Sequence, residues 1–369
     1  MKKLLITALS LTAGIVLTIS CSKSDSGNQP GKSDSFDRKG LLTNVSNNII
    51  IPAYASFQTS VNALNDAITV FNSAPDAAKL TAAQNALVAA YKQWQSASQY
   101  EIGPAAQVNF RVNVNTFPAD TKQINDNITS GTYNPDQLAN LAAKGLPAID
   151  YLLFGTGASN AAILLQYTTD AQATKRKTYL AALIAETKKL TDGVVTGWNG
   201  DYKNTFINAD GTDAGSSLGQ LVNQLVYDYE IIKNYEIGIP AGVQSMGTTF
   251  PEKVQGYYDK ASLQLTLFHL QAVKNLYMGK DGLGLDDYLI KVNAKYTDGK
   301  PLNDVITAQF ATAETKLKAL SDPLADNIRT NPTAVKAAYT ELQKLTVFLK
   351  TDMTSSLGIL ITFGDNDGD

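Results

Sequence analysis

The sequence predicts an all-α protein made of two helical bundles. Over long segments, apolar residues recur at spacings of three or four, which is the period of an amphipathic helix. No segment alternates polar and apolar residues with the period of two that marks a strand. The 369 residues are 44% hydrophobic and 18% charged, which provides for a sizeable core and excludes a disordered or collagen-like chain.

The first element is a signal peptide over residues 1–20. Lys2 and Lys3 precede an apolar run, Leu4–Ile19, that is shorter than the roughly 20 residues needed to span a bilayer. The chain's only cysteine, Cys21, follows where cleavage would fall, in a pattern similar to that of bacterial lipoproteins, whose cysteine is acylated. We therefore expect Cys21 to anchor the protein in the outer membrane, on its periplasmic or cell-surface side; the alternative is a secreted protein with a free thiol.

A tether and two bundles are expected to follow. Residues 21–36 are rich in Ser, Gly and Asp and hold no large apolar residue before the end of the segment, as in a flexible linker. The bundles are predicted at residues 37–157 and 158–369. The stretch YEIGPA at residues 100–105 recurs as YEIGIPA at residues 235–241, and each copy closes a long helix. An internal duplication and two independent helix-stop signals explain this echo equally well.

The helices of the two bundles carry boundary signals. Asp76 precedes one amphipathic run and Gly103 ends it, while Asn199-Gly200 follows another run, and Pro332 opens the last. The expected helices lie at about residues 41–72, 76–102, 135–143, 147–154, 173–198, 215–237, 251–278, 302–320 and 332–357.

The scarcest residues exclude several classes of chemistry. One Cys and one His in the whole chain exclude an intrachain disulfide, a Cys/His zinc site and a multi-histidine metal centre. A serine-hydrolase triad would need His269, for which a packed position in a helix is the simpler interpretation. The match to G-x-S-x-G at residues 215–219 follows a loop instead of a strand, so it is expected to start a helix. A formal charge of -3 makes nucleic acid a poor partner.

The segment GLPAIDYLLFG at residues 145–155 resembles the imelysin family. That family carries G-x-H-x-x-E in a similar setting, and its His and Glu, three residues apart, share a helical face and could ligate a metal. In this chain the positions of that motif are Gly145, Pro147 and Asp150. Proline has no side-chain ligand, so the first donor of the motif is replaced by a residue that suits a helix start.

Other landmarks extend the resemblance over most of residues 40–369. The segment from Tyr91 through Trp94 to Pro104 is similar to the family's early stretch, residues 235–242 to its second-half turn, and residues 357–369 to its closing segment. The resemblance implies an all-helical fold of two bundles, an envelope location, a historical label as metallopeptidases and a link to iron uptake.

Three carboxylates adjoin these family-like turns and are the candidate metal ligands. They are Asp150, Glu101 and Glu236, and carboxylates suit hard cations such as an iron or calcium ion. Glu101 and Glu236 have a simpler interpretation as solvated residues at helix ends. The tail at residues 365–369 resembles a calcium loop but places its Gly at the wrong position, so a solvated acidic tail is expected.

The sequence therefore predicts an imelysin-like envelope lipoprotein that binds a metal or small ligand within an uptake system. Its partners would be the membrane, through Cys21, and proteins of that system. The first alternative is an imelysin-type metallopeptidase, which the loss of the motif histidine at Pro147 weakens. The second is a surface scaffold without a small-molecule site. Convergent carboxylates in the cleft would favour metal, and an apolar pocket would favour an organic ligand.

Overall fold

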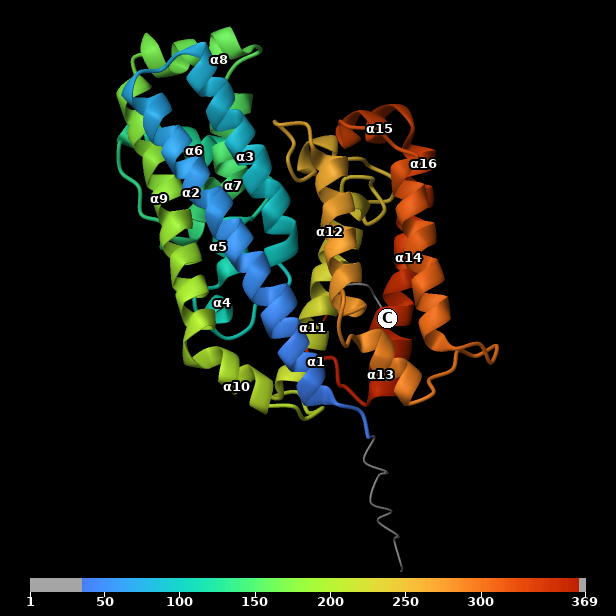
Figure 1. Cartoon of the computed structure of the whole chain (residues 1–369). Helices are drawn as coiled ribbons and strands as arrows, with labels where there is room; N and C mark the ends of the chain where they lie inside the picture. The colour runs from blue at the N-terminus through green and yellow to red at the C-terminus, as the bar shows by residue number, and fades with distance from the viewer. Residues whose placement is uncertain (1–34, 365–369) are drawn as a thin grey trace, which may run out of the picture. The chain divides into compact units, whose positions relative to one another are not determined.

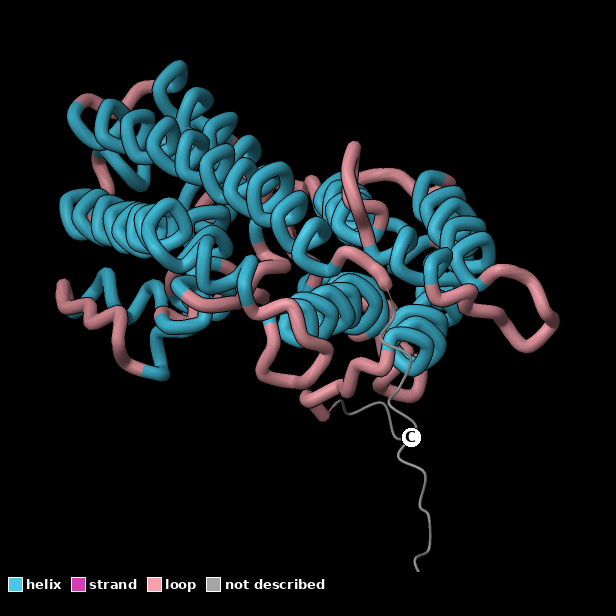
Figure 2. Tube along the Cα trace, turned by 60° about the horizontal axis from the view of Figure 1, so that its bottom comes forward, coloured by secondary structure: helices cyan, strands magenta, loops and turns pink. Residues whose placement is uncertain are grey.

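The computed structural model describes residues 35–364. The expected signal peptide, the lipidation site Cys21, nearly all of the tether and the acidic tail lie outside these residues. Within them the chain is helical, and the only β-type pairing is an isolated bridge between Lys295 and Pro301. The predicted all-α fold is confirmed (Figure 2).

The helices follow one another with short connections. The α labels are those of Figure 1, and η marks a 3-10 or π-helical segment. In chain order they are α1 Arg38–Asn44, η1 Val45–Ile50, α2 Ile51–Ser73, α3 Ala77–Ala97, α4 Pro104–Gln107, α5 Phe110–Val114, α6 Thr121–Ser130, η2 Leu138–Ala143, α7 Gly145–Asp150, η3 Tyr151–Gly155, α8 Asn160–Thr168, α9 Ala173–Gly197, η4 Trp198–Tyr202, α10 Lys203–Asn208, α11 Ser217–Glu230, η5 Ile231–Gly238, η6 Pro251–Lys253, α12 Ser262–Tyr277, α13 Leu285–Lys291, α14 Leu302–Lys318, α15 Leu324–Thr330, α16 Pro332–Val347, η7 Phe348–Met353 and α17 Thr354–Leu357.

The first bundle is built on α2, α3 and α9, in which α3 and α9 both pack along α2 (Figure 1). Helix α3 starts at Asp76, whose carboxylate accepts the backbone N–H of Lys79, as an N-cap residue does. One face of α2 is fully buried because its apolar residues recur every three or four positions. These residues are Tyr54, Phe57, Val61, Leu64, Ile68 and Phe71.

The second bundle is built on α11, α12, α14 and α16. Helix α14 packs on α16 and α12, and α16 packs on η5, the π-helical continuation of α11. Helix α12 also packs on α3, and this contact joins the two bundles. The described residues from Phe36 onward accordingly form one compact unit.

The packing corrects the expected bundle boundary at residue 157. Helices α8 and α9 lie after that point in the chain, yet they pack on α3 and α2 of the first bundle. The first bundle therefore extends to about the end of α10. An internal duplication of the bundles stays a prediction.

The expected helix at 251–278 was also too long at its start. Gly256 and Lys260 have φ angles of 59° and 63°, a left-handed conformation that interrupts a helix. Only η6 forms before this break, and the long helix α12 begins at Ser262.

Among the described residues, no single helix is both long and apolar enough to cross a membrane, although a bent pair, Gly145–Gly155 with Asn160–Thr168, passes that test by length and composition.

Candidate functional site

The one histidine lies at the centre of a buried cluster of charges between the bundles. Nδ1 of His269 lies 2.7 Å from a carboxylate oxygen of Glu236, and Nε2 lies 2.5 Å from Oδ2 of Asp228. The hydroxyl of Ser98 donates to the same Asp228 oxygen and lies 3.2 Å from Nε2. All four residues are at least 96% buried. The ring is thus held between two carboxylates, one at each nitrogen.

Arg111 completes this cluster from the first bundle. Its Nε donates to the backbone oxygen of Ser98 and lies 3.2 Å from Oδ1 of Asp228, while one Nη donates to Gln224. The other, Nη1, has no hydrogen-bond partner among the described residues. We refer to Ser98, Arg111, Asp228, Glu236 and His269 together as the His269 cluster.

The charges in the cluster fix one another's protonation. Burial favours the neutral imidazole, but the carboxylates of Asp228 and Glu236 outweigh it and raise the pKa of His269 to about 10. Burial alone would raise the pKa of Asp228. His269 and Arg111 outweigh this effect and together hold that pKa below the ordinary value. At neutral pH the ring is therefore an imidazolium with both N–H groups engaged, which cannot take a proton as a general base.

Helices from both bundles place these side chains. Ser98 caps the C-terminus of α3, His269 lies in the middle of α12, and Asp228 lies near the end of α11. Glu236 lies on the π-helical segment η5, whose wider turn is often found at functional sites. Arg111 follows Phe110, and the ring of Phe110 packs 5.4 Å from that of Trp94, which fixes α5 against α3.

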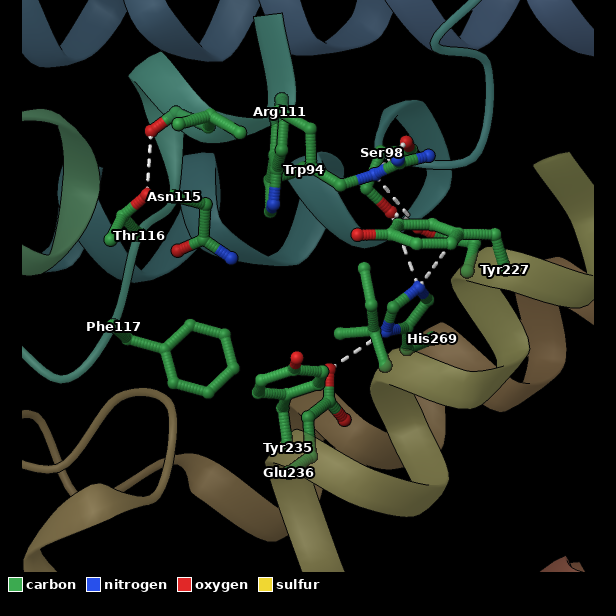
Figure 3. Close-up of a pocket in the computed structure, with 13 residues that line it drawn as sticks. Trp94, Ser98, Arg111, Asn115, Thr116, Phe117, Tyr227, Tyr235, Glu236 and His269 are labelled. Atoms are coloured by element: carbon green, nitrogen blue, oxygen red, sulfur yellow. Dashed lines mark hydrogen bonds and ion pairs between the residues drawn. The ribbon is translucent and has the colours of Figure 1, made fainter. Parts of the chain in front are cut away.

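A pocket of about 290 Å³ opens over the cluster, and aromatic side chains form much of its wall (Figure 3). Tyr235 is 52% exposed and Tyr227 is 39% exposed, and the guanidinium of Arg111 stacks 5.1 Å from the Tyr227 ring centre. The residues lining this His269 pocket are Trp94, Ser98, Arg111, Val112, Asn115, Thr116, Phe117, Tyr227, Asp228, Ile231, Tyr235, Glu236 and His269.

Two of the three predicted carboxylates meet at this cluster. Glu236 binds His269, and Glu101 accepts the backbone N–H of Arg111 at 2.9 Å. Burial raises the pKa of Glu101, and Arg111 acts in the opposite direction. Both glutamates are buried or half-buried, so the interpretation as solvated helix-end residues was wrong. One echo segment thus contributes Glu236 to the cluster, and the other places Glu101 beside it, on the backbone of Arg111.

The third predicted carboxylate lies in a neighbouring pocket of about 240 Å³, which we call the Asp150 pocket. The two pockets share Phe117. Oδ2 of Asp150 accepts the backbone N–H of Tyr258 at 3.1 Å. Burial and the neighbouring carboxyl group of Asp259 raise the pKa of Asp150 well above its ordinary value, and burial raises that of Asp259 to about 7. The lining residues are Tyr91, Phe117, Pro118, Ala119, Thr121, Pro147, Asp150, Glu252, Lys253, Val254, Gly256, Tyr257 and Tyr258.

Comparison with known proteins identifies the family. The imelysin family model matches residues 50–349. The chain belongs to the imelysin family. It is 23% identical to iron-regulated protein A of Synechococcus elongatus over 292 residues, which cover 76% of this chain and 75% of that protein.

Solved structures of imelysin-like proteins share the fold. A protein of Parabacteroides distasonis, provisionally named an iron-regulated protein A precursor, aligns with a TM-score of 0.72 at 16% identity, over 90% of this chain and 97% of that one. An imelysin-like protein of Psychrobacter arcticum aligns with a TM-score of 0.67 at 20% identity, over 88% and 97%. At these identities the likeness shows the fold alone.

The residues at the imelysin motif of this chain do not fit a metal ion. Pro147 offers no donor atom, and one Asp150 oxygen already accepts a backbone N–H. The His269 cluster does not fit one either, because Asp228 and Glu236 lie at opposite nitrogens of the ring and cannot converge on one ion with it. In the described part of the chain, no group of three or more His, Cys, Asp or Glu side chains is arranged to hold a metal. The predicted ligands Asp150, Glu101 and Glu236 accordingly do not form one metal centre.

The sequence interpretation missed most of the His269 cluster. Arg111 lies on a five-residue helix that no periodic pattern marks, and Asp228 is a polar residue within an otherwise apolar helix face. Aspartate at a buried position is rare without a partner, so the apolar residues around Asp228 were the one available signal. His269 was expected to be packed, and it is buried, but between two charges that lie far from it in sequence.

Proposed function

We propose that this imelysin-family protein is an exported binding component of iron acquisition, and that the His269 pocket takes up iron complexed with a small organic carrier. The observation that carries the proposal is the composition of the pocket. Aromatic side chains form its wall, and paired, buried charges form its floor.

The aromatic wall favours an organic ligand. Trp94, Phe117, Tyr227 and Tyr235 present ring surface to a cavity large enough for a small molecule. A bare hard cation would need about six or more oxygen ligands, which the pocket residues do not converge to supply. An organic carrier would itself supply the ligands of the metal ion. The outer surface of the carrier would then contact the protein.

The charged floor gives such a carrier a fixed polar contact. Nη1 of Arg111 has no partner among the described residues, and a guanidinium is well suited to a carboxylate or phenolate oxygen. Because Ser98, Asp228 and Gln224 hold the rest of the side chain, the donor is positioned before the ligand arrives.

The relatives support the role in iron acquisition. Two of them carry the name iron-regulated protein A, and one of these is named as a precursor, which agrees with export. We propose that Cys21 carries the lipid anchor in the outer membrane and that the protein passes its ligand to partner proteins of an uptake system.

Fluorescence of Trp94 tests the proposal directly. The chain has two tryptophans, and the other, Trp198, lies buried beside Tyr202 and Phe206, so Trp198→Phe leaves Trp94 as the reporter. Ferric citrate, a ferric catecholate and a ferric hydroxamate are titrated, each beside its iron-free carrier, and beside FeCl₂ and CaCl₂. Saturable quenching by at least one complex, with none by the bare ions, is expected.

A pair of variants with similar exposure controls for general surface effects. Tyr235→Ala removes part of the pocket wall and is expected to weaken binding at least tenfold, whereas Leu165→Ala, at 55% exposure on α8, leaves it unchanged. Absence of quenching by every complex, or equal binding by the Tyr235→Ala variant, would overturn the proposal. Proteolysis that disappears with a chelator and with Asp150→Ala would favour the metallopeptidase instead.

A further inference from the structure

We infer that the Asp150 pocket is a second binding site, specific for the ammonium group of a small organic amine. This inference rests on atoms of the Asp150 pocket alone and does not depend on what the His269 pocket binds.

Polar atoms in and beside this pocket lack partners. Asp150 and Tyr91 both line the cavity and are at least 98% buried, and neither Oδ1 of Asp150 nor the hydroxyl of Tyr91 has a hydrogen bond. Oδ2 of Asp259, beside them, has none either. Leaving a buried polar group without a partner costs free energy, because the group has given up its hydrogen bonds to water. Native structures therefore rarely do so unless a ligand or water completes the site.

The protein supplies no cation to these carboxyl groups. Among the described residues, no Lys or Arg forms an ion pair with Asp150 or Asp259. The one basic residue among those that line the pocket, Lys253, places its Nζ 4.1 Å from the ring centre of Phe250. A cationic ligand would therefore bring the missing charge and the missing N–H donors together.

The walls suit an organic cation. The lining includes the rings of Tyr257 and Tyr258, which pack edge to face at 5.1 Å between centres, and aromatic faces attract ammonium groups. Pro147, which stands at the imelysin motif's histidine position, adds apolar surface to the lining. An ammonium group donating to Oδ1 of Asp150, with its alkyl chain against these walls, satisfies both features of the pocket.

Calorimetric titration of the full chain, purified in detergent, tests the site. The probe is n-butylammonium, and n-butanol and butyrate are the neutral and anionic molecules of matching length, with CaCl₂ as the metal. Binding of n-butylammonium alone is expected. Asp150→Asn, which keeps the shape but cannot ionise to pair with an ammonium group, is expected to weaken that binding at least tenfold.

Further variants separate a specific site from a loss of folding. Tyr91→Phe removes only a hydroxyl and is expected to weaken binding by a smaller factor, while Asp352→Asn on η7 and Tyr235→Ala in the other pocket leave it unchanged. The inference is overturned if n-butylammonium gives no saturable heat, if n-butanol binds equally well, if Asp150→Asn binds as tightly as the natural chain, or if Ca²⁺ binds in its place.

Discussion

At the scale of single residues, Asp228 is the group on which the His269 cluster depends most. Its two oxygens face His269 and Arg111, and its side chain is fully buried. Asp228→Asn keeps the shape but takes the paired carboxylate from Arg111 and leaves His269 with Glu236 as its one remaining counter-charge. We expect the free energy of unfolding to fall by about 3 kcal/mol or more, because breaking a buried ion pair from one side costs about that much. Urea denaturation at pH 7 measures it.

The matched control is an aspartate in an exposed pair. Asp126 lies 2.6 Å from Lys122 on α6, and both side chains are more than half exposed. Asp126→Asn is expected to leave the denaturation midpoint unchanged, since surface pairs contribute little. Equal midpoints for the Asp228 and Asp126 variants would show that the cluster is not a stabilising network.

The raised pKa of His269 predicts how stability depends on pH. Its folded pKa of about 10 exceeds the unfolded value of about 6.5. The stabilisation that the charged ring provides is therefore complete below about pH 6.5, declines above it and is gone once the pH exceeds about 10. The difference in unfolding free energy between the natural chain and His269→Gln should shrink steadily from pH 6.5 to 10. A difference that stays constant over this range would contradict the charge pairing.

The site residues that could be predicted are those that stand in a recognisable local pattern of the sequence. Glu101 and Glu236 were found because they stand in a repeated stretch at helix ends, and Asp150 because it stands in the imelysin motif. Arg111 and Asp228 carry no such local signal. Their roles arise only when α5 and α11 meet across the two bundles, and that contact is not encoded in the spacing of either segment.

At the scale of elements, Gly145 fixes how α7 meets α5. Its φ of 68° favours glycine, and a Cβ added there would overlap the backbone oxygen of Val114, the last residue of α5. Gly145→Ala is expected to lower the free energy of unfolding by about 2 kcal/mol or more, because both strain and overlap must be relieved. Since Arg111 lies on α5, ligand binding at the His269 pocket should weaken as well.

A glycine within a helix provides the control for this prediction. Gly193 lies exposed on α9, and a Cβ there would meet nothing within 4 Å. Gly193→Ala should raise the free energy of unfolding by about 0.5–1 kcal/mol, as glycine weakens a helix interior. Thermal melting of the two variants should thus move in opposite directions; a shared direction would refute the role given to Gly145.

The long helices were predictable and the short ones were not, for a physical reason. Helices such as α2, α3 and α9 bury one face over many turns, so their period is visible in the sequence. Segments such as α5 and α15 span only one or two turns, and tertiary packing holds them in place. The break before α12 was missed because Lys260 adopts a left-handed conformation that no local preference signals.

At the scale of the whole molecule, the two bundles should unfold together. The first bundle contributes Ser98 and Arg111 to the cluster, and the second contributes Asp228 and His269. Separating the bundles would therefore break the hydrogen bonds and the ion pair that join these residues. Helix α12 also packs directly on α3. Calorimetry should show a single cooperative transition whose van't Hoff and calorimetric enthalpies agree. Two separate transitions would indicate independently stable bundles.

The most direct test of the account concerns the protonation of His269, on which its role as a paired charge instead of a catalytic base depends. Because the chain has one histidine, ¹⁵N labelling of histidine gives a single pair of ring signals in the NMR spectrum. At pH 7.5 we expect both nitrogens to be protonated, with titration only near pH 10. A neutral ring at pH 7.5, titrating near 6.5, would contradict the account and return His269 to the candidates for a general base.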